Sequence, residues 1–122
     1  MTQRVLIADD EPNIVASLEF LMEQAGFEVK VAPDGAAALA LVASFRPDLV
    51  LLDVMMPVKN GYEVCQHLKS DPATRAVKVV LLSAKGRDVE VAKGLELGAD
   101  AYVTKPFSTR ELVAKVRELL GG

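Results

Sequence analysis

The sequence predicts an α/β protein in which one parallel β-sheet is covered by helices on both faces. Short apolar runs alternate with longer segments whose apolar residues recur every three or four positions, as in alternating strands and helices. The run 49–52 is wholly apolar, as expected for a strand buried on both faces. With 122 residues, 51% of them apolar and 25% charged, the chain fits one folded domain spanning residues 1–122.

Turn residues or breaks in the apolar pattern bound each expected element. In chain order these are strand 5–8, helix 12–25, strand 27–32, helix 36–45, strand 49–53, helix 61–70, strand 78–82, helix 88–97, strand 101–104 and helix 109–120. Pro12 suits the first turn of the first helix, and Gly26 suits its C-terminal end. The second strand alternates charged with apolar residues, which is typical of an edge strand. Pro47 ends the Ala-rich second helix, because the residue before a proline disfavours helical geometry.

The second half of the chain follows the same rules. Gly61 opens the third helix after the loop that follows strand 49–53. Gly94 lies inside the fourth helix, and its cost of roughly 1 kcal/mol relative to alanine leads us to expect a helix that shifts easily. Ser108 and Glu111 have the spacing of a capping box at the start of the last helix.

Charge and composition exclude several classes of function. The net charge of −3 gives no electrostatic footprint for DNA or RNA, and no apolar run is long enough to span a membrane. The single Cys65 rules out an internal disulfide. We therefore expect a cytoplasmic protein without direct contact to nucleic acid or to a membrane.

Polar residues of a particular kind stand where the predicted strands end. Asp9 and Asp10 follow the first strand, and Asp53 ends the third. Ser83 and Lys105 follow the fourth and fifth strands. Because the carboxyl ends of parallel strands share one edge of a sheet, we expect these side chains to converge. Asp53 alone could merely cap a turn, but turn polarity does not explain the whole set.

Such a cluster is suited to phosphoryl transfer. Three carboxylates repel one another, so a divalent cation is expected among them, and ligands that are all oxygen favour Mg²⁺. A carboxylate beside Mg²⁺ and Lys105 is a credible nucleophile toward phosphorus. Phosphoryl transfer needs mainly positioning and charge neutralisation, which Mg²⁺, Lys105 and the Ser83 hydroxyl would supply.

Four motifs carry a resemblance to a known family. They are VLIADDE at 5–11, DVMMP at 53–57 with Gly61, LSA at 82–84 and TKPF at 104–107. With them the sequence resembles the receiver domain of two-component response regulators and is similar to the single-domain chemotaxis and sporulation regulators. The resemblance covers essentially the whole chain. It implies the flavodoxin-like receiver fold, a doubly wound five-stranded parallel sheet of strand order 2-1-3-4-5 with its site between the first and third strands.

The resemblance also implies roles at the acidic site. Asp53 accepts a phosphoryl group from a phosphohistidine of a histidine kinase or histidine phosphotransfer protein and becomes 4-aspartylphosphate. Asp10, Asp53 and the backbone carbonyl of Met55 ligate Mg²⁺, while Asp9 acts through a water or by orienting the site. Lys105 pairs with Asp53 or with the phosphate.

Further roles implied by the resemblance concern the switch. Ser83 binds the phosphoryl group, and Tyr102 moves into the space that Ser83 leaves. The readout face then comprises the fourth helix, the fifth strand and the fifth helix. Pro106 follows a cis peptide bond, and Pro57 and Gly61 have structural roles.

The leading interpretation is a phospho-acceptor signalling switch that is no enzyme beyond its own phosphorylation and dephosphorylation at Asp53. A haloacid-dehalogenase phosphatase would carry a second Asp where Met55 stands. A flavodoxin-like cofactor module would carry a phosphate loop in place of the acidic residues 9–11. A receiver that docks without phosphorylation is the remaining alternative, and the intact site argues against it.

The kind of partner that receives the signal depends on whether the chain is complete. A complete chain would act through contact with an output protein, and a fragment would belong to a larger protein with a fused output domain. Either would be a monomer or a phosphorylation-dependent dimer. Met55 and Lys85 flank the site and are expected to tune the hydrolysis of the phosphorylated form.

Overall fold

In a computed structural model, which describes residues 2–84 and 88–121, five strands alternate with five helices. The elements are β1 (Arg4–Ala8), α1 (Pro12–Gln24), β2 (Glu28–Ala32), α2 (Gly35–Phe45), β3 (Leu49–Asp53), α3 (Gly61–Ser70), β4 (Lys78–Ser83), α4 (Asp88–Glu96), β5 (Ala101–Thr104) and α5 (Thr109–Leu119). Every boundary agrees with its predicted position to within one residue. Lys85, for which an effect on hydrolysis was predicted, lies outside the described residues.

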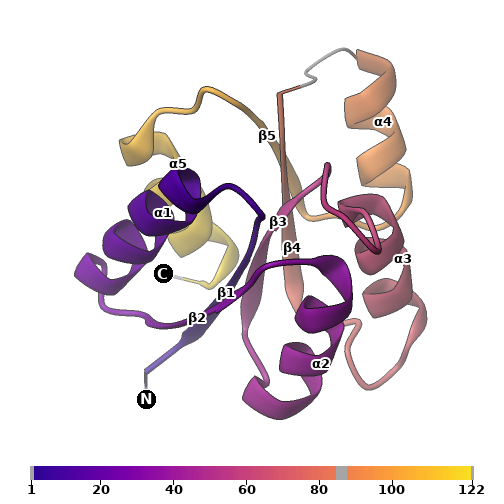
Figure 1. The fold of residues 1–122 in the computed structure, drawn as a ribbon, viewed down its shortest axis with the longest axis horizontal. Coiled ribbons are helices and arrows are strands. Elements are labelled where there is room, and N and C mark those ends of the chain that lie inside the picture. Colours follow the sequence, from indigo (N-terminus) through magenta and orange to yellow (C-terminus); the bar gives the residue numbers. More distant parts are fainter. Residues whose placement is uncertain (1, 85–87, 122) are drawn as a thin grey trace.

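The strands form one parallel sheet in the order β2-β1-β3-β4-β5, which confirms the predicted topology. Helices α1 and α5 cover one face of this sheet, and α2, α3 and α4 cover the other (Figure 1). None of the helices in the described part of the chain combines the length and the apolar character that a membrane span requires.

The central strand β3 takes part in two hydrophobic cores at once. Leu51 packs into the core under α1 and α5, and Leu52 packs into the core that includes residues of α2 and α3. Every residue of β3 is buried, as predicted from the apolar run. Strand β2 lies at the edge and alternates between exposed and partly buried positions, as its charge alternation predicted.

Backbone contacts join the start of α3 to the end of β3. The Gly61 N–H donates to the carbonyl of Val54 at 2.9 Å. A Cβ atom at Gly61 would lie 2.5 Å from the carbonyl oxygen of Asp53, so only glycine permits this close approach. Asn60 and Glu63 form a capping box at the same helix start, which was not predicted from the sequence. These contacts hold the carboxyl end of β3 in place.

Candidate functional site

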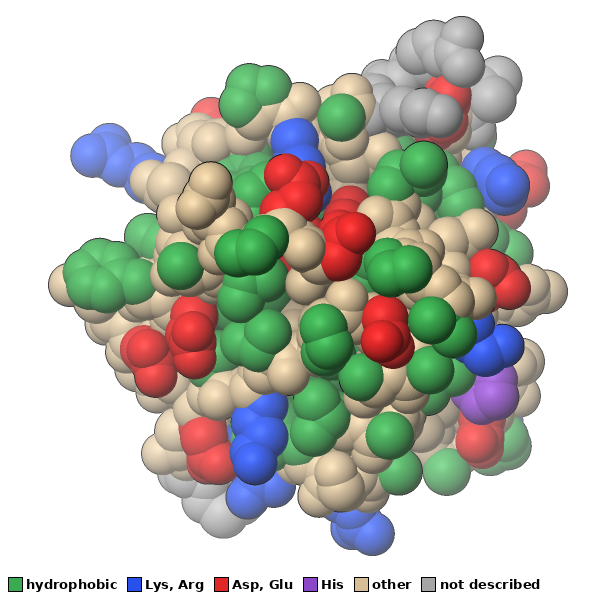
Figure 2. Space-filling model, in the orientation of Figure 1, with side chains coloured by type: hydrophobic (Ala, Val, Ile, Leu, Met, Phe, Trp, Pro, Cys, Tyr) green, Lys and Arg blue, Asp and Glu red, His purple; other side chains and the backbone are tan. Residues whose placement is uncertain are grey.

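One ammonium group bridges two buried carboxylates at the carboxyl edge of the sheet. Asp53 is the last residue of β3 and its exposed fraction is 3%, while Asp9 follows the neighbouring strand β1 and is also buried. Lys105 Nζ lies 3.2 Å from Asp9 Oδ2 and 3.4 Å from Asp53 Oδ1. Figure 2 shows the acidic side chains gathered beside basic atoms over the ends of β1 and β3. Residues far apart in sequence therefore converge as predicted.

Two further carboxylates leave this site with an excess of negative charge. Asp10 is exposed, and carboxylate oxygens of Asp9, Asp10 and Asp53 all lie within 4.8 Å of one another. The Glu11 carboxylate lies 3.4 Å from Lys105 Nζ, and the Glu11 N–H donates to Asp9 Oδ1 at 2.9 Å. Glu11 was not predicted from the sequence to take part in the site, although it continues the acidic run after the first strand. Among the residues that the structure describes, the site thus holds four carboxylates and one ammonium.

The pKa values show the effect of this imbalance. The pKa of Asp53 is raised to about 6: burial raises it most and the charge of Asp9 also raises it, while Lys105 and the Met55 N–H oppose the shift. Burial alone would lower the pKa of Lys105, but the charges of Asp53, Asp9 and Glu11 raise it above its ordinary value. Lys105 therefore stays a cation, and Asp53 is a carboxylate whose charge is only partly compensated.

The carboxylate cluster has the donor set of a site for a hard divalent cation. Asp9, Asp10 and Asp53 offer oxygen ligands, which Mg²⁺ and Ca²⁺ prefer. A cation among them would neutralise the charge that raises the pKa of Asp53. The Met55 N–H lies 3.4 Å from Asp53 Oδ1, so the backbone of Met55 adjoins the same carboxylate. These residues fit a bound cation.

Strands β4 and β5 bring Ser83 and Lys105 to the same edge. In the sheet register Asp53 pairs with Leu82 and Ser83 pairs with Thr104, so Ser83 lies one residue beyond the level of Asp53 on the adjacent strand. The Lys105 N–H donates to the Ser83 carbonyl at 2.7 Å. Ser83 is buried, and the peptide bond between Lys105 and Pro106 is cis.

Tyr102 contacts a different part of the molecule. It lies on β5, is partly buried, and its hydroxyl is 3.4 Å from the hydroxyl of Tyr62 on α3. Tyr62 was not singled out from the sequence, where it is one partly apolar residue in an amphipathic helix. The predicted switch residue Tyr102 is thus tied to α3, while Pro57 is exposed in the loop between β3 and α3.

Comparison with protein families gives one match over most of the chain. Residues 5–117 match the model described as the response regulator receiver domain. The curated relatives include the DNA-binding response regulator MtrA of Mycolicibacterium smegmatis, 48% identical over 120 residues. That alignment covers 98% of this chain and 51% of the relative, so the chain spans about half the length of the curated relatives it matches.

Solved structures share the fold closely. A protein of Chloroflexus aurantiacus described as a response regulator superposes with a TM-score of 0.94, is 33% identical, and is covered completely, as is this chain. The structure described as the BeF3-activated DrrB receiver domain has a TM-score of 0.90 and 35% identity, again with complete coverage of both chains. The expectation that residues 1–122 make no direct nucleic-acid contact stays a prediction, because the curated relatives are named DNA-binding proteins and are longer.

Proposed function

Because the chain belongs to the response regulator receiver domain family, we propose that it is a phospho-acceptor switch whose Asp53 takes a phosphoryl group from a phosphohistidine. The observation that carries this proposal is the buried carboxylate of Asp53, bridged by Lys105 to Asp9 yet left with uncompensated negative charge. The family relation supplies the class of partner, a histidine kinase or histidine phosphotransfer protein.

The transfer uses an Asp53 oxygen as the nucleophile. That oxygen bonds to phosphorus as the bond between phosphorus and the histidine nitrogen breaks, and the imidazole leaves with the electron pair. With a pKa of about 6, Asp53 is mostly ionised at neutral pH and is ready to attack. Lys105 stabilises the charge of the phosphoryl oxygens. Bound Mg²⁺, held by Asp10, Asp53 and the Met55 carbonyl, with Asp9 orienting it, would neutralise the same oxygens.

The surroundings of the site support reaction with a partner protein. A groove of about 600 Å³ adjoins Lys105 between α1 and the segment after β5, and its lining includes Ile14 and Phe107. This partly apolar groove gives a histidine-bearing partner a surface next to the acceptor. The phosphoryl group stays on the chain until water removes it, so the protein turns over no outside substrate.

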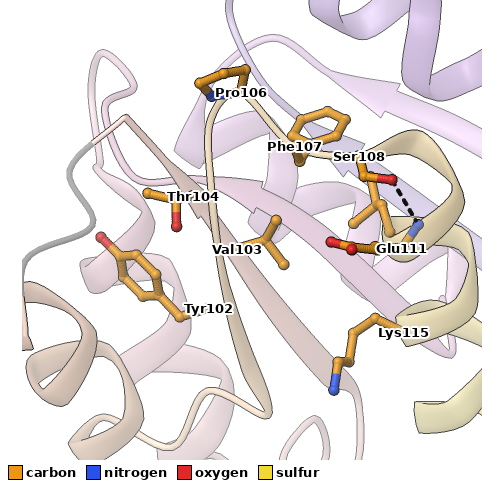
Figure 3. A pocket seen from close by; sticks show the side chains of 9 residues that line it. Tyr102, Val103, Thr104, Pro106, Phe107, Ser108, Glu111 and Lys115 are labelled. Atoms are coloured by element: carbon orange, nitrogen blue, oxygen red, sulfur yellow. Dashed lines mark hydrogen bonds between the residues drawn. The ribbon is translucent and has the colours of Figure 1, made fainter.

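The output is proposed to arise at the face formed by α4, β5 and α5. A pocket of about 370 Å³ opens on this face between β5 and α5, with Tyr102 and Lys115 among its lining residues (Figure 3). When the Ser83 hydroxyl binds the phosphoryl group, Tyr102 changes position and alters this face. Since the curated relatives are named DNA-binding response regulators, a fused output domain is the first candidate for what the face contacts.

The experiment that tests this function is intact mass measurement after incubation with acetyl phosphate and Mg²⁺. We expect the native chain to gain the mass of one phosphoryl group, only when Mg²⁺ is present. Asp53→Asn should gain nothing. Asp34→Asn is the matched control, because Asp34 caps α2 without belonging to the acidic cluster and asparagine caps equally well. An adduct that persists in Asp53→Asn, or no adduct on the native chain, would contradict the proposal.

A further inference from the structure

A pair of tyrosines, Tyr62 on α3 and Tyr102 on β5, links three elements behind the site. Their hydroxyl oxygens are 3.4 Å apart, and the Tyr62 hydroxyl also donates to the backbone carbonyl of Glu90 in α4 at 3.4 Å. Each hydroxyl can both donate and accept, so either one serves as the donor between the two rings. Lys93 Nζ lies 4.6 Å from the centre of the Tyr62 ring, in cation–π range. Tyr62 therefore contacts β5 and α4 together.

The ring of Tyr102 also lies against α4, at Gly94. Gly94 is buried there, and a Cβ atom on it would lie 2.9 Å from Tyr102 Cδ2 and 2.8 Å from Leu81 Cδ1. Gly94 thus lets the Tyr102 ring approach the bare backbone of α4, a role beyond the flexibility expected from the sequence. The ring edge contacts Gly94 while the hydroxyl contacts Tyr62.

We propose that Tyr62 is a positioning residue that holds Tyr102 and the start of α4 in the arrangement seen here, and so sets how readily the output face responds to phosphorylation. This inference rests on the proposed function, in which Tyr102 must move when a phosphoryl group is present. Any such movement first breaks the contact between the two hydroxyls. Tyr62 therefore opposes activation, and its removal favours it.

The chemistry of Tyr62 suits this role. Burial and the hydrogen bond to Tyr102 raise the pKa of Tyr62 above its usual range, so its hydroxyl stays protonated at physiological pH. Both hydrogen bonds are long, and each is therefore weak. Loss of the hydroxyl should change an activation equilibrium by about two- to fivefold.

The chain has only two tyrosines, which makes a direct experiment possible. Tyrosine labelled with ¹³C at Cζ gives two resonances, and Tyr62→Phe leaves that of Tyr102 alone. The probe of activation is beryllofluoride with Mg²⁺, which imitates a phosphoryl group on a carboxylate, titrated against the full chain. The matched control is Thr74→Val. Thr74 follows α3, and its partly buried hydroxyl donates to the carbonyl of Leu68 in that helix.

We expect Tyr62→Phe to shift the Tyr102 resonance in the free chain and to tighten beryllofluoride binding about two- to fivefold. Tyr102→Phe should perturb the Tyr62 resonance in return. The double variant should bind no more tightly than the stronger single variant, because both substitutions break the same contact. Thr74→Val should change neither quantity.

An unchanged Tyr102 resonance, unchanged or weaker beryllofluoride binding by Tyr62→Phe, or additive effects in the double variant would overturn the inference. Failure of the proposed function gives a different result: the native chain would not bind beryllofluoride, or Asp53→Asn would bind it equally well. In that case the Tyr102 resonance of free Tyr62→Phe still decides whether the positioning contact exists.

Discussion

Two partly buried lysines lie at opposite edges of the same sheet. Lys105, at the carboxyl edge, has a side chain that is 12% exposed and faces several carboxylates. Lys69 extends from the end of α3 to the amino edge, and its side chain is 16% exposed. It contacts the Asp100 carboxylate at 3.0 Å and the carbonyls of Arg75 and Val77 at 3.1 and 2.7 Å. The two residues are equally enclosed and differ in their partners.

The difference lies in how the charges balance. Around Lys69 one ammonium meets one carboxylate, and Asp100 also accepts the Val79 N–H at 2.8 Å. Around Lys105 one ammonium meets the carboxylates of Asp9, Glu11 and Asp53. The ion pair of Lys69 is electrically balanced and supports the fold, whereas the described residues at the carboxyl edge keep an excess of negative charge, which the proposed function assigns to binding a cation and a phosphoryl group. Residual charge, and not burial, separates the functional edge from the structural one.

Removing each lysine should produce the largest change in stability at its edge of the sheet. Lys69→Met removes the ammonium that donates to Asp100 and to two carbonyls, and we expect the free energy of unfolding to fall by about 2–4 kcal/mol. Lys105→Met should also lose stability in metal-free buffer, because the carboxylates lose their cation. Urea denaturation with and without Mg²⁺ measures both. Mg²⁺ should restore much of the loss in Lys105→Met and none in Lys69→Met, and equal restoration would contradict the contrast.

Neutralising one aspartate at each edge should change stability in opposite directions. In metal-free buffer at pH 7 we expect Asp53→Asn to gain on the order of 1–3 kcal/mol, because ionised Asp53 is destabilising where its pKa is about 6. Asp100→Asn should lose about 1–3 kcal/mol, since it weakens the contacts to Lys69 and to the Val79 N–H. A shared sign would show that the two edges do not differ in charge balance.

The pH dependence of the Asp53→Asn effect follows from the same shift. The native fold binds the Asp53 proton more tightly than the unfolded chain does, since the pKa rises from 3.8 to about 6. The contribution of Asp53 to stability is therefore complete below about pH 4 and is lost as pH rises through 6. Urea denaturation at pH 4 and pH 7 should show a larger gain for Asp53→Asn at the higher pH, and a gain that shrinks would be inconsistent with the raised pKa.

The smallest expected difference concerns backbone strain at the two edges. Val58, near the site, is 75% exposed and has φ 70°, while Arg46, near the amino edge, has φ 52°. Left-handed geometry costs a β-branched side chain more than an unbranched one. Val58→Gly should therefore raise stability by about 0.5–1 kcal/mol and Arg46→Gly by less, as thermal denaturation would measure. A larger gain at Arg46 would mean that strain is not concentrated beside the site.

The fold and the acidic cluster could be predicted because both depend on where strands end. The apolar runs mark the strand boundaries, and Asp53 and Ser83 stand at the last positions of two strands. In a parallel sheet those positions are neighbours regardless of how the helices pack against it. The convergence of Lys105 with Asp9 needed no knowledge of helix packing.

The contacts that could not be predicted depend on how helices lie against the sheet. The meeting of Tyr62 with Tyr102 depends on how α3 lies against β5, and the pairing of Lys69 with Asp100 depends on how the last turn of α3 lies against the amino edge of the sheet. The periodicity of apolar residues in strands and helices does not specify either of these placements. Asn60 is different, because its spacing to the Glu at N3 carries a capping-box signal that sequence inspection can find.

The double packing of β3 has a consequence for how the chain can vary in length. Because Leu51 and Leu52 belong to different cores, adding or deleting one residue within β3 would exchange the contents of both cores and displace Asp53. Segment 71–77, between α3 and β4, belongs to neither β3 nor the acidic cluster. Insertions and deletions should therefore be tolerated better at residues 71–73, ahead of the carbonyls that Lys69 contacts, than in β3. Selection for a folded protein then also preserves the position of the proposed phosphoryl acceptor.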